Sequence, residues 1–151
     1  MHLLFVCTGN TCRSPMAEVI ARRLFAERDV ADVTISSAGT SAWPGSPASD
    51  GALLVALEHG LTLGEHRARQ LSPELVASAD LILTMGPHHL ERAEALGGSG
   101  RSYLLTGFVG GKGRPVSDPF GGDLEVYRAT YAELEREIAA IVEKLAERRP
   151  S

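Results

Sequence analysis

One segment near the start of the chain, residues 7–15 (CTGNTCRSP), combines residue types that could perform phosphoryl transfer. It follows an apolar run at residues 3–6, and Gly9 lets the backbone fold tightly around a ligand. A helix that begins at its end would present backbone amides that have no partner within the helix and can bind an anion. The planar guanidinium of Arg13 can hold two phosphate oxygens. The same positive field lowers a thiol pKa, so we interpret Cys7 as a nucleophile aimed at phosphorus.

The other residues of this segment suit supporting roles in an anion-binding loop. Ser14 is a typical N-cap residue, Pro15 suits the first helical position, and the Ser14 hydroxyl could donate a hydrogen bond to the thiolate. Asn10 could brace the loop through its amide side chain. Besides Cys7 and Arg13, the predicted phosphate-binding loop consists of Thr8, Gly9, Asn10, Thr11, Cys12 and Ser14.

A simpler interpretation of Cys7 and Arg13 is structural. Cys7 could be a small apolar residue that ends a core strand, and Arg13 could be a surface arginine, because their spacing alone is a weak pattern. However, a cation in the first turn of a helix faces the positive end of the helix dipole unless an anion is bound there. The combination of strand, glycine-containing loop and helix therefore favours the catalytic interpretation.

Asp118, which precedes Pro119, is the candidate for the general acid. The proline disfavours a helical backbone at Asp118 and places the carboxyl group on a loop. An Asp-Pro pair by itself is common in turns. Together with a nucleophile at Cys7, this carboxyl group could protonate the leaving group and then act as a base toward water.

The pattern of apolar residues predicts an α/β fold in which short strands alternate with helices. Such alternation is typical of a parallel sheet with helices on both faces and with ligands beyond the carboxyl ends of its strands. Cys7 directly follows the first strand, and we expect a single domain over residues 1–151. The predicted strands are residues 3–6, 33–36, 81–84 and 103–105, and the predicted helices are residues 15–28, 49–59, 88–96 and 124–145.

Composition argues against several functional classes. Hydrophobic residues make up 44% and charged residues 23% of the chain, as in globular proteins. The net charge is −4 and there is no long Lys/Arg run, which argues against nucleic-acid binding. The pair Arg148-Arg149 is interpreted as a solvated tail. No apolar run is long enough to span a membrane and no signal peptide is recognised, so the cytoplasm is the expected location. Two cysteines are too few for a disulfide scaffold or a structural zinc site.

These residues resemble the low-molecular-weight protein tyrosine phosphatase family, and the resemblance extends over nearly the whole chain. It implies a four-stranded parallel sheet flanked by helices, with Cys7 as nucleophile, Arg13 as phosphate ligand and Asp118 as acid. It also implies phosphorylated proteins as substrates and a reaction without metal or other cofactor, and we expect a monomer. The matching segments are residues 7–14, 37–40 (SAGT), 80–85 (DLILTM) and 118–119.

Two features differ from the tyrosine-specific pattern of that family. Thr11 stands where those members usually carry a bulky aliphatic residue. Directly after the Asp-Pro pair they often have two aromatic residues, whereas here Phe120 is followed by Gly121-Gly122. Both features are similar to the bacterial protein arginine phosphatases and imply phosphoarginine, because a hydroxyl at Thr11 and a carboxylate at Asp118 could both bind a guanidinium. Phosphotyrosine is the alternative, and Thr11 could instead satisfy loop backbone groups. Trp43 could line the pocket rim, as the family suggests, or be a partly buried anchor.

Three other groups of polar residues invite a functional interpretation. Cys12 could form a reversible disulfide that protects Cys7 from irreversible oxidation, or it could be an inert packed thiol. Residues 66–69 (HRAR) are predicted to form a solvated turn. His88-His89 are predicted to begin a helix and to bind nothing.

Other functional classes on the same fold fit the sequence less well. Arsenate reduction would need cysteines after Cys12, and none follows. A phosphoryl carrier has no need of an acid such as Asp118 and would show burst kinetics without turnover. A catalytically inactive phospho-binding module would lack the nucleophile or the acid, yet candidates for both are present. A carrier or binding module is therefore the alternative from another class.

Overall fold

The structure, a computed structural model, describes residues 1–110 and 112–147, so the predicted tail at Arg148-Arg149 lies outside the described residues. Its centre is a four-stranded sheet in the order β2-β1-β3-β4, and every neighbouring pair of strands is parallel. This confirms the fold class predicted from the sequence. The strands are β1 (His2–Cys7), β2 (Thr34–Gly39), β3 (Leu81–Thr84) and β4 (Ser102–Leu104).

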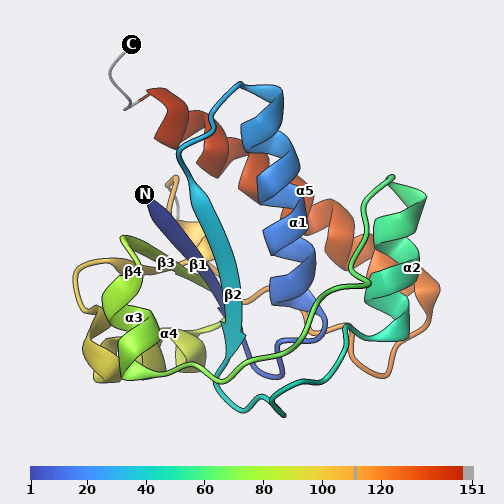
Figure 1. Ribbon diagram of the computed structural model, residues 1–151, viewed down its shortest axis with the longest axis horizontal. Helices are drawn as coiled ribbons and strands as arrows, with labels where there is room; N and C mark the ends of the chain where they lie inside the picture. The colour runs from blue at the N-terminus through green and yellow to red at the C-terminus, as the bar shows by residue number, and fades with distance from the viewer. Residues whose placement is uncertain (111, 148–151) are drawn as a thin grey trace.

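Helices cover both faces of this sheet (Figure 1). Helices α1 and α5 pack together on one face with α2 against α5, while α3 and α4 lie on the other face. Their bounds are α1 (Arg13–Glu27), α2 (Asp50–Glu58), α3 (Pro73–Ser78), α4 (Pro87–Ala93) and α5 (Leu124–Glu147), with short helical turns at η1 (Glu94–Gly98) and η2 (Leu105–Gly107).

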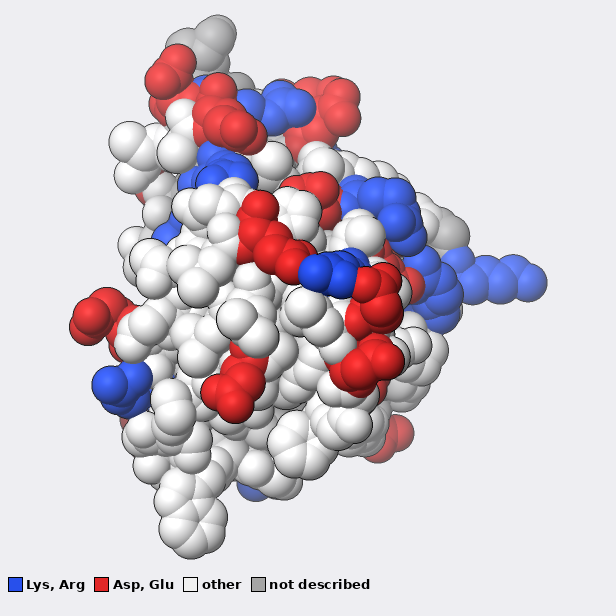
Figure 2. Space-filling view, turned by 90° about the vertical axis from the view of Figure 1, so that its right-hand side faces the viewer, with Lys and Arg blue, Asp and Glu red and all other residues white. Residues whose placement is uncertain are grey.

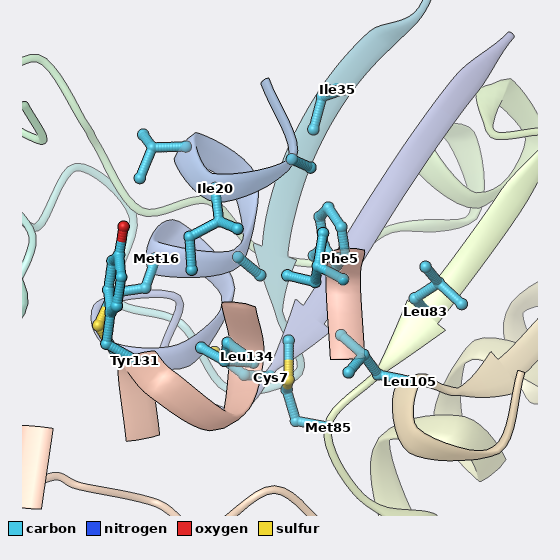
Figure 3. Close-up of a cluster of buried hydrophobic side chains, with 14 of the residues drawn as sticks. Phe5, Cys7, Met16, Ile20, Ile35, Leu83, Met85, Leu105, Tyr131 and Leu134 are labelled. Carbon is cyan, nitrogen blue, oxygen red and sulfur yellow. The ribbon is translucent and has the colours of Figure 1, made fainter. Parts of the chain in front are cut away.

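Strand β1 is buried on both faces, which explains its run of apolar residues without polar alternation. Leu3, Phe5 and Cys7 belong to the larger hydrophobic cluster, which also includes side chains of α1 and α5. Leu4 and Val6 belong to the smaller cluster beneath α3 and α4. Figure 3 shows Cys7 within the larger cluster, near the carboxyl end of β1. The candidate nucleophile thus lies where the central strand leaves the core.

Helix α5 is the longest helix, and its apolar stripe agrees with the prediction. The side chain of Leu124 is partly buried, and the other members of the stripe are buried. Each such side chain contributes about 1.5–3 kcal/mol when it is fully removed from water. Figure 2 shows acidic and basic side chains interspersed on the face where α2 and α5 lie, without a large patch of one sign. The buried members are Tyr127, Tyr131, Leu134, Ile138, Ile141 and Leu145.

Three elements differ from the prediction for physical reasons. Helix α3 was not predicted, because six residues capped by Ser72 are too short to show a clear helical period. Helix α4 ends before the predicted residue 96 and passes into η1, where Gly97 has a φ of 109°. Strand β2 continues to Gly39, beyond the predicted residue 36, and pairs with β1 along its whole length. Its last residues include serines, which do not look like a buried strand in the sequence. Their buried hydroxyls are hydrogen-bonded in the structure.

The membrane prediction can be compared with the described helices. Within residues 1–110 and 112–147, no helix is long and apolar enough to cross a membrane.

Candidate active site

The loop between β1 and α1 is anchored to the strand beside it. The backbone amide of Thr40 donates to the Cys7 carbonyl at 2.9 Å, and that of Ser41 donates to the Thr8 carbonyl at 2.9 Å. At Gly39 the two backbones approach so closely that a Cβ atom would lie 2.4 Å from the Thr8 carbonyl oxygen. Only glycine fits there, which gives a physical reason for the glycine in the SAGT segment.

Cys7, Ser14 and Asn10 form a buried hydrogen-bonded chain. The Asn10 side-chain amide donates to Ser14 Oγ at 2.8 Å, and Ser14 Oγ lies 2.9 Å from Cys7 Sγ. Because Ser14 accepts from Asn10, its own hydrogen is free to point at the sulfur. Ser14 was predicted to cap α1, and this was wrong. Helix α1 begins at Arg13 without a side-chain cap, and the Ser14 hydroxyl serves Cys7 instead.

Asn10 is the hub of a second set of bonds beneath the loop. It is fully buried, with a φ of 57°. Its amide nitrogen donates to Ser37 Oγ at 3.0 Å, and Ser37 donates onward to Glu18 at 2.6 Å. Its amide oxygen accepts from the backbone of Arg69 at 3.0 Å, and its carbonyl lies 2.7 Å from His66 Nε2. The loop conformation is therefore fixed by groups that lie far away in the sequence.

Residues 66–69 were predicted to form a solvated turn, and Arg67 and Arg69 are exposed as predicted, whereas His66 is partly buried. His66 and the backbone amide of Arg69 both contact Asn10, and Arg67 donates to nearby backbone carbonyls. No local pattern could have revealed these contacts, because they join positions 56 and 59 residues apart.

The environment of the Cys7 thiol acts on its pKa in two directions. Burial raises the pKa. It is lowered by the side-chain and backbone hydrogen bonds from Ser14, by the charge of Arg13 and by the backbone of Asn10. The effect of burial is the largest, so the net pKa of Cys7 is raised. The expectation of a lowered pKa is therefore wrong in its net direction. The predicted lowering effects are present at this position, but burial in the cluster of Figure 3 outweighs them.

Arg13 connects the loop to the segment that carries Asp118. Its guanidinium donates to the Val116 carbonyl at 2.9 Å and lies 3.6 Å from the Asp118 carboxylate. The backbone amide of Val116 donates in turn to Met85 at the end of β3, at 2.8 Å. The Arg13 side chain is 7% exposed, whereas that of Asp118 is 50% exposed. The two predicted catalytic groups, about 100 residues apart in sequence, therefore meet at one edge of the sheet.

A cavity of about 220 Å³ opens above the loop and contains most of the predicted site residues. Asn10 and Ser14 are not part of its lining and brace the loop from behind. Trp43 is not among the lining residues and is 82% exposed, so it is not the partly buried anchor that was the alternative to a rim position. The lining residues are Cys7, Thr8, Gly9, Thr11, Cys12, Arg13, Asp118 and Phe120.

Cys12 shares this cavity with Cys7, and both cysteines are free thiols. The sulfur of Cys12 lies 3.3 Å from Ser49 Oγ and 3.3 Å from the Tyr127 hydroxyl. Burial, together with the bond to Cys12, raises the pKa of Tyr127 to about 12, so its hydroxyl keeps its proton.

His88-His89 lie in the first turn of α4, close to the predicted start of this helix, and His89 makes a contact within the protein that the sequence did not indicate. His89 Nε2 lies 2.8 Å from the hydroxyl of Thr8 in the loop. In the part of the chain that the structure describes, no cluster of three or more His, Cys, Asp or Glu residues could hold a metal ion.

Comparison with known proteins agrees with this fold. The family profile described as low molecular weight phosphotyrosine protein phosphatase matches residues 2–151. The chain belongs to this family and is a low-molecular-weight protein phosphatase.

Individual relatives differ in the substrate that their names state. The protein-arginine-phosphatase of Bacillus subtilis is 38% identical over 147 residues, which cover 96% of this chain and 97% of that protein. The low molecular weight protein-tyrosine-phosphatase PtpB of Staphylococcus haemolyticus is 41% identical over 135 residues, covering 89% and 92%. A solved structure of a YwlE arginine phosphatase mutant with a phosphorylated active-site serine superimposes with a TM-score of 0.92, at 37% identity, covering 99% and 98%.

Proposed function

We propose that this phosphatase hydrolyses phosphoarginine in proteins. The observation that carries the proposal is the position of Thr11, which lines the same cavity as Cys7, Arg13 and Asp118. Among the described residues, the one hydrogen-bond partner of its hydroxyl is Cys12 Sγ, a weak contact at 3.7 Å. The hydroxyl is thus available to accept a hydrogen bond from a planar, polar guanidinium next to phosphorus, which a phenol ring could not donate.

The aromatic content of the cavity supports the same substrate. Phe120 is the single aromatic residue among the lining residues, and it is 75% exposed. Gly121 has a φ of 82°, and a Cβ atom at Gly122 would lie 2.9 Å from Val126, so both positions are constrained to glycine by the turn. A phenyl ring would therefore find one aromatic wall rather than two, whereas a guanidinium can stack on a single ring.

The first chemical step would form a bond between Cys7 Sγ and phosphorus. The thiolate attacks in line, the bond from phosphorus to the substrate nitrogen breaks, and its electron pair takes a proton from Asp118. Arg13 and the loop amides hold the phosphoryl oxygens during transfer. Ser14 donates to the sulfur and stabilises the thiolate that must form despite its burial.

The second step would release inorganic phosphate. Asp118, now a carboxylate, takes a proton from water, the water oxygen bonds to phosphorus, and the bond from phosphorus to Cys7 breaks. The half-exposed position of Asp118 gives water access to this carboxylate. The step regenerates the Cys7 thiolate and needs no cofactor.

The proposal includes five further expectations that follow from the sequence. Phosphorylated proteins are the substrates, Cys12 serves as the redox partner of Cys7, and residues 1–151 act as one phosphatase domain in the cytoplasm as a monomer. Phosphotyrosine is the alternative substrate, favoured by the 41% identity to a protein-tyrosine-phosphatase.

The test is turnover of phosphoarginine and phosphotyrosine peptides of the same sequence by the wild type and by Thr11→Ile. We expect the wild type to prefer phosphoarginine and the variant to lose that preference by about tenfold or more, because one hydrogen bond to a charged group is removed. Thr34→Ile, at an exposed position at the start of β2, makes the same change outside the cavity and should leave the preference unchanged. Preference for phosphotyrosine in the wild type would overturn the substrate assignment and leave the phosphatase intact.

A further inference from the structure

His89 is a buried histidine whose contacts the catalytic steps above do not use. It lies near the start of α4, its side chain is 0% exposed, and its Nε2 atom is 2.8 Å from Thr8 Oγ1. Its other ring nitrogen, Nδ1, is buried and has no hydrogen-bond partner among the described residues. The environment of the ring is thus strongly asymmetric between its two nitrogens.

This asymmetry decides which nitrogen carries the proton. A proton on Nδ1 would bury an unpaired N–H donor, whereas a bare Nδ1 leaves only an unpaired acceptor, and orphaned buried donors are the rarer case. Burial, with the neighbouring charges of His88 and Arg13, lowers the pKa of His89 to about 4, so the ring carries one proton at neutral pH. The tautomer that leaves no buried donor unpaired has this proton on Nε2, from which it is donated to Thr8 Oγ1 at 2.8 Å.

The donated bond determines what the Thr8 hydroxyl can do. A hydroxyl has one hydrogen to donate and two lone pairs to accept with. His89 donates to one lone pair, and Arg13 Nη2 lies 3.5 Å from the same oxygen as a second donor. The described residues offer no acceptor for the Thr8 hydrogen, and Thr8 lines the cavity above Cys7. The hydrogen is therefore free to point into the cavity.

We propose that His89 is a positioning residue that makes Thr8 a fixed hydrogen-bond donor to an oxygen of the bound phosphoryl group. Thr8 would then be a phosphate-binding residue through its side chain, in addition to the backbone amides of the loop. The proposal rests on the proposed role of this loop as the phosphate site. It assigns to α4, which carries none of the predicted site residues, a function in substrate binding.

The test is the inhibition constant of inorganic phosphate, measured against an aryl phosphate substrate. Thr8→Val removes the hydroxyl and nearly preserves its shape, and we expect phosphate to bind about tenfold more weakly or worse. His89→Leu should cause a similar loss with Thr8 intact, and the double variant should lose no more than either single variant. The control Glu91→Gln changes an exposed position on the same helix and should bind phosphate as the wild type does.

Two further measurements separate positioning from packing. In His89→Gln the side-chain amide can donate a hydrogen bond from near the position that Nε2 occupies in the wild type, so we expect phosphate to bind nearly as tightly as in the wild type. The side chain of His89→Asn is too short to reach Thr8, so this variant should bind phosphate as weakly as His89→Leu. ¹⁵N NMR of the histidine ring in the wild type should show a protonated Nε2 and a bare Nδ1.

Each contrary outcome has a distinct meaning. If the wild type does not bind inorganic phosphate, the proposed function of the loop fails and this inference fails with it. If phosphate binds the wild type and Thr8→Val equally, or if the losses of Thr8→Val and His89→Leu add in the double variant, the inference alone is overturned. A proton on Nδ1 in the wild type also overturns it.

Discussion

The two loops that meet in the cavity are held in opposite ways. In the phosphate loop, Asn10 and Ser14 are fully buried and Arg13 is 6% exposed, and hydrogen bonds from β2, residues 66–69 and α4 support the loop. In the loop after η2, Phe120 is 75% exposed, and the bonds of the Asp118 side chain to the described residues are the ion pair with Arg13 and a bond from its own turn. A rigid loop can hold the phosphoryl group that all substrates share, while a loosely held loop can contact the side chain that differs between them.

The largest effect should come from the acid on the loosely held loop. Asp118→Asn keeps the shape of the side chain but removes the transferable proton, so we expect kcat for a phosphoarginine peptide to fall about 10²–10⁴-fold. Steady-state kinetics measures this, with Asp123→Asn as a control on a neighbouring exposed carboxylate that bonds the start of α5. A loss smaller than tenfold would show that Asp118 is not the acid.

His89, which supports the rigid loop from α4, should make the free energy of unfolding depend on pH. The folded protein holds this ring neutral with a pKa of about 4, whereas an unfolded histidine binds a proton below about pH 6.5. Stability is therefore lost as pH falls from about 6.5 to about 4, by on the order of 3 kcal/mol from this residue. His88 and Arg13 oppose protonation of the ring, and Asp118 favours it.

Urea unfolding of the wild type and of His89→Gln at about pH 7 and about pH 4.5 isolates this contribution. We expect the variant to lose less stability on acidification than the wild type. Equal losses in the two proteins would contradict a neutral, buried His89.

Gly39, beside the phosphate loop, and Gly121, in the loop that carries Asp118, allow a glycine-to-alanine substitution to be compared between the two loops. In Gly39→Ala the new Cβ would lie 2.4 Å from the Thr8 carbonyl oxygen, so we expect about 3 kcal/mol of destabilisation and a loss of kcat/KM as the loop shifts. In Gly121→Ala the Cβ meets nothing within 4 Å, and only the positive φ of 82° costs about 1–2 kcal/mol. Thermal unfolding with parallel activity assays compares them. Equal losses of activity would contradict the contrast between the loops.

The smallest effect should be a shift in the reactivity of the thiol. Ser14→Ala removes a hydrogen bond that lowers the pKa of Cys7, so this pKa should rise further. A rise of one unit would slow alkylation of Cys7 by iodoacetamide about tenfold at neutral pH. The pH profile of alkylation measures the shift, with Ser41→Ala, an exposed hydroxyl, as the matched control. An unchanged or lowered midpoint would contradict the role of Ser14.

The sequence was informative where function and structure depend on neighbouring residues. The apolar stripe of α5 and the strand, loop and helix around Cys7 are local patterns. The fold was therefore predictable, and so were the cavity-lining residues between positions 7 and 13. Asp118 was found because the Asp-Pro pair and the loop together match one family pattern.

The rest depends on contacts between distant segments. His66 and Arg69 contact Asn10 across more than fifty residues, and His89 contacts Thr8 across 81, so no spacing rule indicates them. The exposure of Trp43 likewise depends on how its loop is placed on the surface.

The most direct test of the account is to detect phosphate covalently bound to Cys7. Asp118→Asn should be mixed with p-nitrophenyl phosphate, whose good leaving group needs little acid assistance, so that the second step is the slow one. Intact-mass and peptide mass spectrometry should then show one phosphoryl group on the peptide that contains Cys7, retained in a Cys12→Ala background and lost in a Cys7→Ala background. Absence of this species, or a phosphoryl group that persists without Cys7, would contradict the proposed mechanism.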